Sequence, residues 1–175
     1  MTDDDTVAAA RAAFARAAGR LAAEGGRVEA VAEFVPARRV LGIQRKAAMR
    51  PLGHAWHLGV LLLQPDLVVR AVGGITRAVE PGHPGHVALS IEDRRDHRAA
   101  AFRGPFERGA TVHYDAAVVP LDADALRASD GPLLLRDGRV LVVWSAAIGA
   151  AGARDLEPYL DERVELLLHP PQGAT

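Results

Sequence analysis

The sequence predicts an α+β fold built on a curled, mainly antiparallel sheet of about six or seven strands, barrel- or sandwich-like in form. Apolar runs separated by Gly and Pro turn signals fill the middle of the chain, and helix-spaced apolar residues stand near both ends. A chain of 175 residues can bury roughly 70% of the surface that its unfolded form exposes. We therefore expect a single domain over residues 1–175, without disulfides because the chain has no Cys.

The first 26 residues are predicted to contain a helix. Their apolar side chains recur at spacings of three and four, at Val7, Ala10, Phe14, Ala17 and Leu21. Asp5 or Thr6 is the expected N-cap, and Gly25-Gly26 is the expected stop. The apolar stripe is thin and rich in Ala, so we expect this helix to cover the sheet.

The centre of the predicted sheet is the stretch Gly53–Val79. Apolar residues fill both faces of Trp56–Leu63, which is typical of a strand covered on both sides. Pro65-Asp66 should then turn the chain. The return strand, Leu67–Val79, contains Gly73-Gly74, and glycines within a strand indicate a bulge or a bend.

The rest of the sheet is expected within residues 27–145. The further predicted strands are Arg27–Val35 and Arg38–Arg45, which Pro36 separates, Ala110–Val119, and the two strands of a second hairpin, Pro132–Leu135 and Arg139–Trp144. Asp137-Gly138 is the strongest hairpin signal in the chain, because a type I′ turn needs positive φ at both of its central positions.

Two more helices and a short helical turn complete the prediction. A helix over residues 90–103 is inserted in the sheet, with Ser90 and Asp93 at capping-box spacing. A helical turn should follow Asp122. The last helix, residues 155–169, has an apolar stripe opposite an acidic face and ends before Pro170.

The charge of the chain bears on its partners. The formal net charge is -1, whereas binding to nucleic acid or to an anionic membrane needs a surplus of Lys and Arg. We therefore expect no nucleic-acid partner and no membrane partner. The N-terminus is acidic, unlike a signal peptide, and no apolar run reaches the ~18 residues of a membrane span. These features favour the cytoplasm.

Histidines and carboxylates gather near the ends of the central stretch. Neutral imidazoles are common ligands of transition metals, and two His-x-x-His pairs could meet at one zinc site. Residues three apart on a strand face opposite ways, however, and no recognised zinc signature completes either pair. The candidate ligand or metal residues are His54, His57, Glu80, His83, His86, His113 and Asp115. His113 and Asp115 could also orient each other as an acid–base pair.

Several segments carry a resemblance to a known family. They are GVLLL, GGITRAVEPGHPG, RAAAFRGPF, GPLLLRDGRVLV and EPYLDERVELLLHPP. Together they are similar to a family of small actinobacterial proteins of uncharacterised function, some of which carry a glutaminase label. The chain lacks the Cys nucleophile of amidotransferase-type glutaminases, and none of its three serines has Ser-x-x-Lys spacing. The resemblance therefore implies no catalytic residue and no activity.

The sequence favours a noncatalytic binding or assembly module. We expect a homodimer in which the last helix or a sheet edge pairs across a two-fold axis. The alternative is a small hydrolase or metal-dependent enzyme that uses the loop histidines. No motif identifies a substrate, and no glycine-rich phosphate loop follows a strand.

Overall fold

The computed structural model of the chain describes all residues except 1, 41, 81–88, 146–148 and 172–175. Its contacts divide the chain into two compact units. Unit 1 comprises Met1–Val28, Trp56–Ala71 and Ala117–Thr175, and unit 2 comprises Glu29–Ala55 and Val72–Ala116. Each unit is therefore assembled from segments that lie far apart in the sequence.

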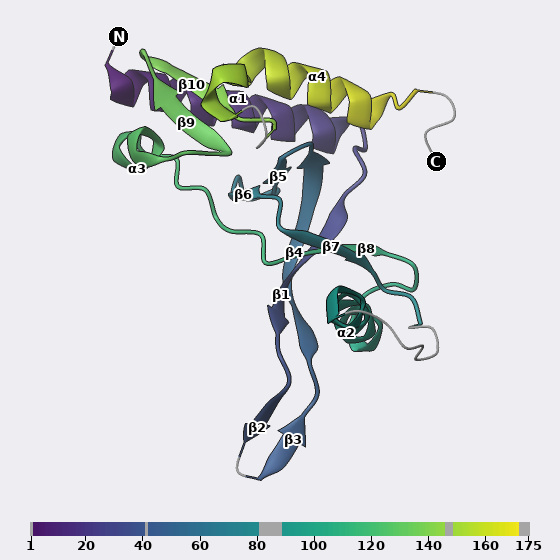
Figure 1. Ribbon diagram of the computed structural model, residues 1–175. Coiled ribbons are helices and arrows are strands. Elements are labelled where there is room, and N and C mark those ends of the chain that lie inside the picture. Colours follow the sequence, from purple (N-terminus) through teal and green to yellow (C-terminus); the bar gives the residue numbers. More distant parts are fainter. Residues whose placement is uncertain (1, 41, 81–88, 146–148, 172–175) are drawn as a thin grey trace. The chain divides into compact units, whose positions relative to one another are not determined.

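The α+β class is confirmed, with N-terminal, middle and C-terminal helices and a mainly antiparallel sheet (Figure 1). The six strands of this sheet are β1 (Glu29–Val35), β4 (Ala48–Leu58), β5 (Leu61–Leu63), β6 (Val69–Ala71), β7 (Gly74–Arg77) and β8 (Thr111–Tyr114). Their order is β6-β5-β4-β1-β8-β7, and β1 pairs with β8 in parallel. The last three residues of β4 belong to unit 1 and the preceding ones to unit 2.

Unit 1 packs two helices against each other and against small strands. Its further elements are α1 (Asp3–Ala23), α3 (Ala123–Ala128), β9 (Leu133–Arg136), β10 (Arg139–Val142), the 3-10 helix η1 (Gly149–Gly152), β11 (Arg154–Asp155) and α4 (Leu156–Leu168). α1 lies alongside α4, and β10 pairs with both β9 and β11 (Figure 1). The predicted apolar stripe of the first helix is buried along its whole length, so this expectation is confirmed.

Thr2 caps α1, so the expected N-cap at Asp5 or Thr6 is wrong. The Thr2 hydroxyl accepts a hydrogen bond from the Asp5 backbone N–H at 3.2 Å, and the Asp5 carboxylate accepts one from the Thr2 N–H at 2.8 Å. This reciprocal capping box satisfies two N–H groups at once, which explains the earlier start. The bond from the Thr2 backbone, followed by that from its hydroxyl, lowers the pKa of Asp5.

The central stretch differs from the expected single strand. Residues Trp56–Leu63 form the end of β4 and all of β5, joined by a tight turn at Gly59-Val60. Gly59 has a φ of 72°, a left-handed conformation that glycine adopts without a Cβ penalty. The Tyr159 hydroxyl of α4 donates to the Leu58 carbonyl at 2.9 Å and accepts from the Val60 N–H at 3.0 Å. A side chain remote in sequence thus holds this turn.

Unit 2 places one helix against the four-stranded part of the sheet that contains β4, β1, β8 and β7. The helix is α2 (Leu89–Arg103). Its buried residues Ala100 and Ala101 meet Ala30, Ala32, Met49 and Val112 in a small core. The pairing of β1 with β4 shifts register between Val31 and Ala32, the kind of irregularity that lets a sheet curl.

Three expected strands have different limits in the structure. Arg38–Arg45 is a hairpin of β2 (Arg38–Val40) and β3 (Ile43–Arg45), not one strand. The strand expected over Ala110–Val119 ends at Tyr114, because Asp115 adopts a φ of 52°. The return strand Leu67–Val79 is split into β6 and β7, with Gly73 in the interval. The apolar pattern did not reveal the turn at Gly42 or the left-handed Asp115, whereas the break at Gly73 lies where the glycines indicated a bend.

The apolar stripe of α4, which suggested pairing between two copies, is used within unit 1. Leu156, Leu160 and Val164 are each at most 3% exposed and belong to the core that α1 shares. These buried side chains of α4 are not exposed for contact with a second copy of the chain. The expected homodimer stays a prediction. Among the described residues, no helix is long and apolar enough to cross a membrane.

Candidate functional site

The feature of unit 2 that its core does not explain is a thin two-stranded ribbon. β2 and β3, with the residues that connect them to β1 and β4, extend away from α2 and from β7 and β8 (Figure 1). We term this ribbon the arm and define it as residues 36–40 and 42–47. Every described side chain of residues 36–39 and 42–46 is exposed. The arm therefore contributes almost nothing to the core.

Local backbone chemistry accounts for the shape of the arm. Pro36 lacks an N–H and breaks the ladder above β1. Gly42, in the turn between β2 and β3, has a φ of 81°, which suits a tight hairpin turn. The register then places Arg38 opposite Arg45 and Arg39 opposite Gln44. Isolated two-stranded ribbons are marginally stable in water, so the arm depends on β1 and β4 at its base.

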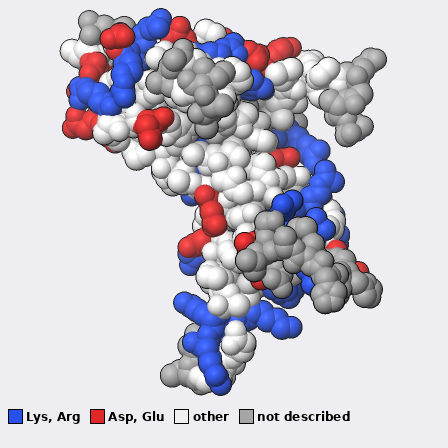
Figure 2. Space-filling view, viewed as in Figure 1, with Lys and Arg blue, Asp and Glu red and all other residues white. Residues whose placement is uncertain are grey.

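The arm concentrates positive charge. It carries Arg38, Arg39, Arg45 and Lys46, and no Asp or Glu occurs between Glu33 and Asp66 in the sequence. Figure 2 shows these cations gathered on the ribbon with no acidic side chain among them. The nearest pair of opposite charges lies at the base, where Arg50 bonds to Glu33. Among the described residues, no carboxylate pairs with Arg38, Arg45 or Lys46.

The cations of the arm suit anionic groups. A guanidinium presents a planar fork of N–H donors that matches phosphate, sulfate or carboxylate oxygens, and an ammonium acts as a compact point charge. The Arg39 Nε–H bonds the Gly42 carbonyl at 3.3 Å, which leaves the other donors of that guanidinium facing solvent. The arm can therefore offer charged donors from both of its strands to one elongated partner.

A second polar arrangement lies inside unit 2. The His113 Nε2 is 2.6 Å from a carboxylate oxygen of Glu29, and the His113 side chain is fully buried while that of Glu29 is 19% exposed. Two ligands of one tetrahedral zinc stand roughly 3.3 Å apart, from Zn–N distances of about 2.0–2.1 Å. The 2.6 Å separation is that of a hydrogen bond and is shorter than that of two zinc ligands. The Glu29 carboxylate can orient and polarise the His113 imidazole.

Four other predicted ligand residues lie within the described part of the chain. His54 is exposed on β4, and the His57 Nε2 lies 2.9 Å from the Gly59 carbonyl. Glu80 is exposed. Asp115 accepts a hydrogen bond from the Phe34 backbone N–H at 3.2 Å, and the partner of His113 is Glu29 instead. The candidates His83 and His86 lie outside the described residues.

Sequence reasoning missed His97, which has no motif around it. Its ring stacks on Tyr114 and meets Phe34 edge-on, with both centroid separations at 4.3 Å. The Tyr114 hydroxyl lies 3.2 Å from the His97 Nδ1. Burial, followed by the Asp115 and Asp93 carboxylates, raises the pKa of Tyr114. This cluster joins α2 to β1 near the base of the arm and therefore supports it.

The hollows of unit 1 offer less chemistry. A groove of about 380 Å³ lies between the N-terminal parts of α1 and α4 and β10, and its charged lining includes Arg139, which pairs with Asp155 at 3.4 Å. A mutually paired Arg and Asp leave little charge for a ligand.

Comparison with known proteins finds no matching family model, no matching curated protein and no matching solved structure.

Proposed function

We propose that this chain is a noncatalytic binding module that attaches to an anionic polymer through the arm. One observation carries the proposal: four cations, which no carboxylate of the described residues pairs with, stand on a ribbon whose described side chains are almost all exposed. A surface hairpin of this kind adds little to the stability of unit 2. Its sequence is therefore best explained by what it contacts outside the chain.

The net charge of -1 does not oppose this proposal. The net charge is the sum over the whole chain, in which acidic residues on other segments offset the cations of the arm. At physiological ionic strength a charge is screened over about 8 Å, so a bound polymer senses the local charge of the surface that it touches. The arm is positive along its whole length, and its nearest sequence neighbour of opposite sign, Glu33, is already paired with Arg50.

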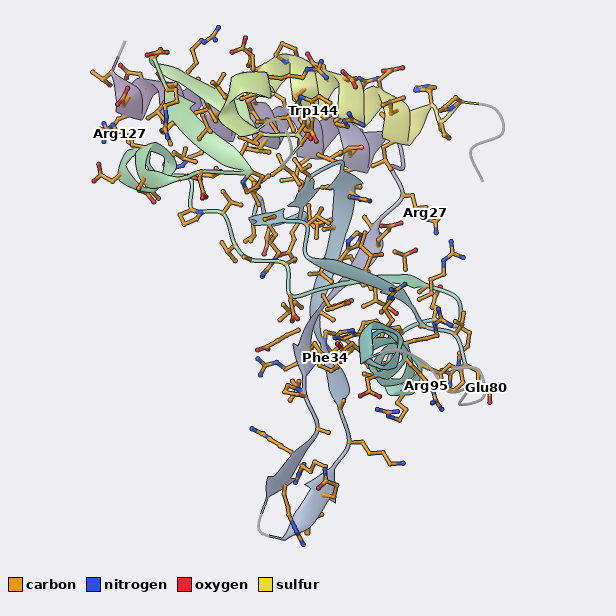
Figure 3. The ribbon with its side chains drawn as sticks, viewed as in Figure 1. Arg27, Phe34, Glu80, Arg95, Arg127 and Trp144 are labelled. Carbon is orange, nitrogen blue, oxygen red and sulfur yellow. The ribbon has the colours of Figure 1, made fainter. Side chains whose placement is uncertain are left out.

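Binding to fluorescently labelled heparin, a soluble sulfated polyanion, tests the proposal. The arm variant replaces four cations: Arg38→Gln, Arg39→Gln, Arg45→Gln and Lys46→Gln. The matched control variant replaces four arginines of other segments: Arg27→Gln, Arg77→Gln, Arg95→Gln and Arg98→Gln. Two of the control arginines are labelled in Figure 3. Each variant changes the net charge from -1 to -5, because four positive charges are lost.

We expect heparin to bind the natural chain and the control variant, and to lose most of its affinity for the arm variant. The reason is that binding should follow the position of the charges and not their sum. The exposed sites of the arm make loss of folding improbable as a cause, and the circular dichroism melting curve of each variant checks this. Equal weakening in both variants would mean diffuse electrostatic attraction, and the proposal would then be wrong.

A further inference from the structure

The arm presents cations on both of its faces. Side chains directly opposite in an antiparallel pair point to the same face, and neighbours along a strand alternate. Arg38 and Arg45 therefore share one face, and Arg39 shares the other with Gln44. An element that lies on a flat anionic surface would instead place its cations on one face and its apolar residues on the other. The arm fits a partner that surrounds it.

The opposition of Arg38 and Arg45 also needs an anion. Like charges directly opposite in a sheet destabilise the pair. Among the described residues, no carboxylate offsets these two guanidinium groups. A phosphate positioned between them would accept donors from both and remove the repulsion. The ribbon is therefore arranged to be completed by a bound anionic group on this face.

The dimensions of the arm match a groove lined with phosphates. Its strands lie about 4.8 Å apart, and the major groove of B-form DNA, about 12 Å wide, admits a two-stranded ribbon. At about 3.3 Å per residue, residues 36–40 extend roughly 17 Å. A duplex carries one negative charge per roughly 1.7 Å of its axis, so about ten phosphates lie within this span.

We propose that the anionic polymer bound by the arm is double-stranded DNA in the B form, with the ribbon in its major groove. This inference rests on the proposed function and names the partner of the same site. A-form RNA has a deep, narrow major groove that protein elements do not enter. Ile43 is 68% exposed on the face of Arg38 and Arg45, and an apolar side chain in the major groove contacts thymine methyl groups.

The inference replaces the expectation that nucleic acid is excluded. That expectation depended on the net charge of the whole chain. The hairpin register gathers four cations on one ribbon, whereas the sequence interpretation treated Arg38–Arg45 as a single strand of the sheet. A folded-back ribbon doubles the charge per unit length, and this local density is what a duplex attracts.

Fluorescence anisotropy with a labelled DNA duplex of roughly 20 base pairs, about four times the length that the arm spans, tests the inference. If the four cations of the arm neutralise four phosphates, the affinity of the natural chain should fall about 150-fold between about 50 and 200 mM salt, with a log–log slope near about -3.6. Arg38→Gln should reduce this fall to about 40-fold, because one phosphate contact is lost. The control variant should keep the slope of the natural chain.

Three further probes separate the partners: an RNA duplex of the same length, heparin, and vesicles containing phosphatidylserine. Binding of the DNA duplex in preference to the RNA duplex and the vesicles is the expected result. Binding of heparin through the arm without binding of DNA would overturn this inference and leave the proposed function standing. Equal affinity for both duplexes, or tighter binding to vesicles, would also overturn it. If the chain binds neither DNA nor heparin, the proposed function itself is wrong.

Discussion

The hydroxyl of Tyr159 holds the turn between β4 and β5, and its removal provides a direct test of how that turn is stabilised. Tyr159→Phe leaves the Leu58 carbonyl and the Val60 N–H without their partner, while Tyr159 itself is 1% exposed. An unsatisfied buried polar group costs about 1–3 kcal/mol, and the Val60 bond is only partly buried. We expect Tyr159→Phe to lower the free energy of unfolding by about 2–3 kcal/mol.

Gly59→Ala perturbs the same turn from the other side. An added Cβ would lie 2.2 Å from the Tyr159 hydroxyl oxygen, and the φ of 72° disfavours any L side chain. The backbone effect costs roughly 1–2 kcal/mol, and overpacking adds about 1–3 kcal/mol. Without the hydroxyl, the nearest atoms to that Cβ are 3.3 Å away. The double variant should therefore lose about 1–3 kcal/mol less than the sum of the single variants.

Urea unfolding followed by circular dichroism measures both quantities, provided that the slope of each transition stays constant. Each kcal/mol should also shift the melting temperature by about 2–4 °C in a chain of this size. Gly19→Ala is the matched control, because that position is in mid-helix with open space around it, and Ala should stabilise it. If the two turn substitutions add to within about 0.5 kcal/mol, the hydroxyl does not crowd Gly59 and the reasoning fails.

Two further predictions concern acid stability and metal content. Bonding to Arg20 lowers the pKa of Glu165 in the folded chain, so its contribution is present above the unfolded value of about 4.3 and is lost as the pH falls below it. Glu165→Gln should reduce stability at neutral pH and have no effect near pH ~2, and a difference independent of pH would contradict this. For a noncatalytic module, we expect purified protein to hold no stoichiometric zinc. Stoichiometric zinc that is lost on His83→Ala would favour the hydrolase or metal-dependent enzyme instead.

The sequence by itself determined the elements that depend on neighbouring residues. The stripe of α1, the cap of α3 at Asp122 and the turn at Asp137-Gly138, with φ values of 50° and 67°, all follow from interactions within a few residues. Their signals are local because a helix or a tight turn closes its own hydrogen bonds. The charge of the arm is equally visible in the sequence as cations at Arg38, Arg39, Arg45 and Lys46.

Tertiary structure alone decided which groups meet. The turn at Gly59 depends on Tyr159, whose hydroxyl bonds Leu58 from 101 residues away, and His113 bonds Glu29 across 84 residues. No sequence motif marks Tyr159 or Glu29 as the partner, because another residue with a suitable polar group could make the same hydrogen bond. The arm required its register as well: only the pairing of β2 with β3 sets Arg38 against Arg45. A periodic pattern reports which side of a strand is buried, but long-range pairing decides which strands and which charges become neighbours.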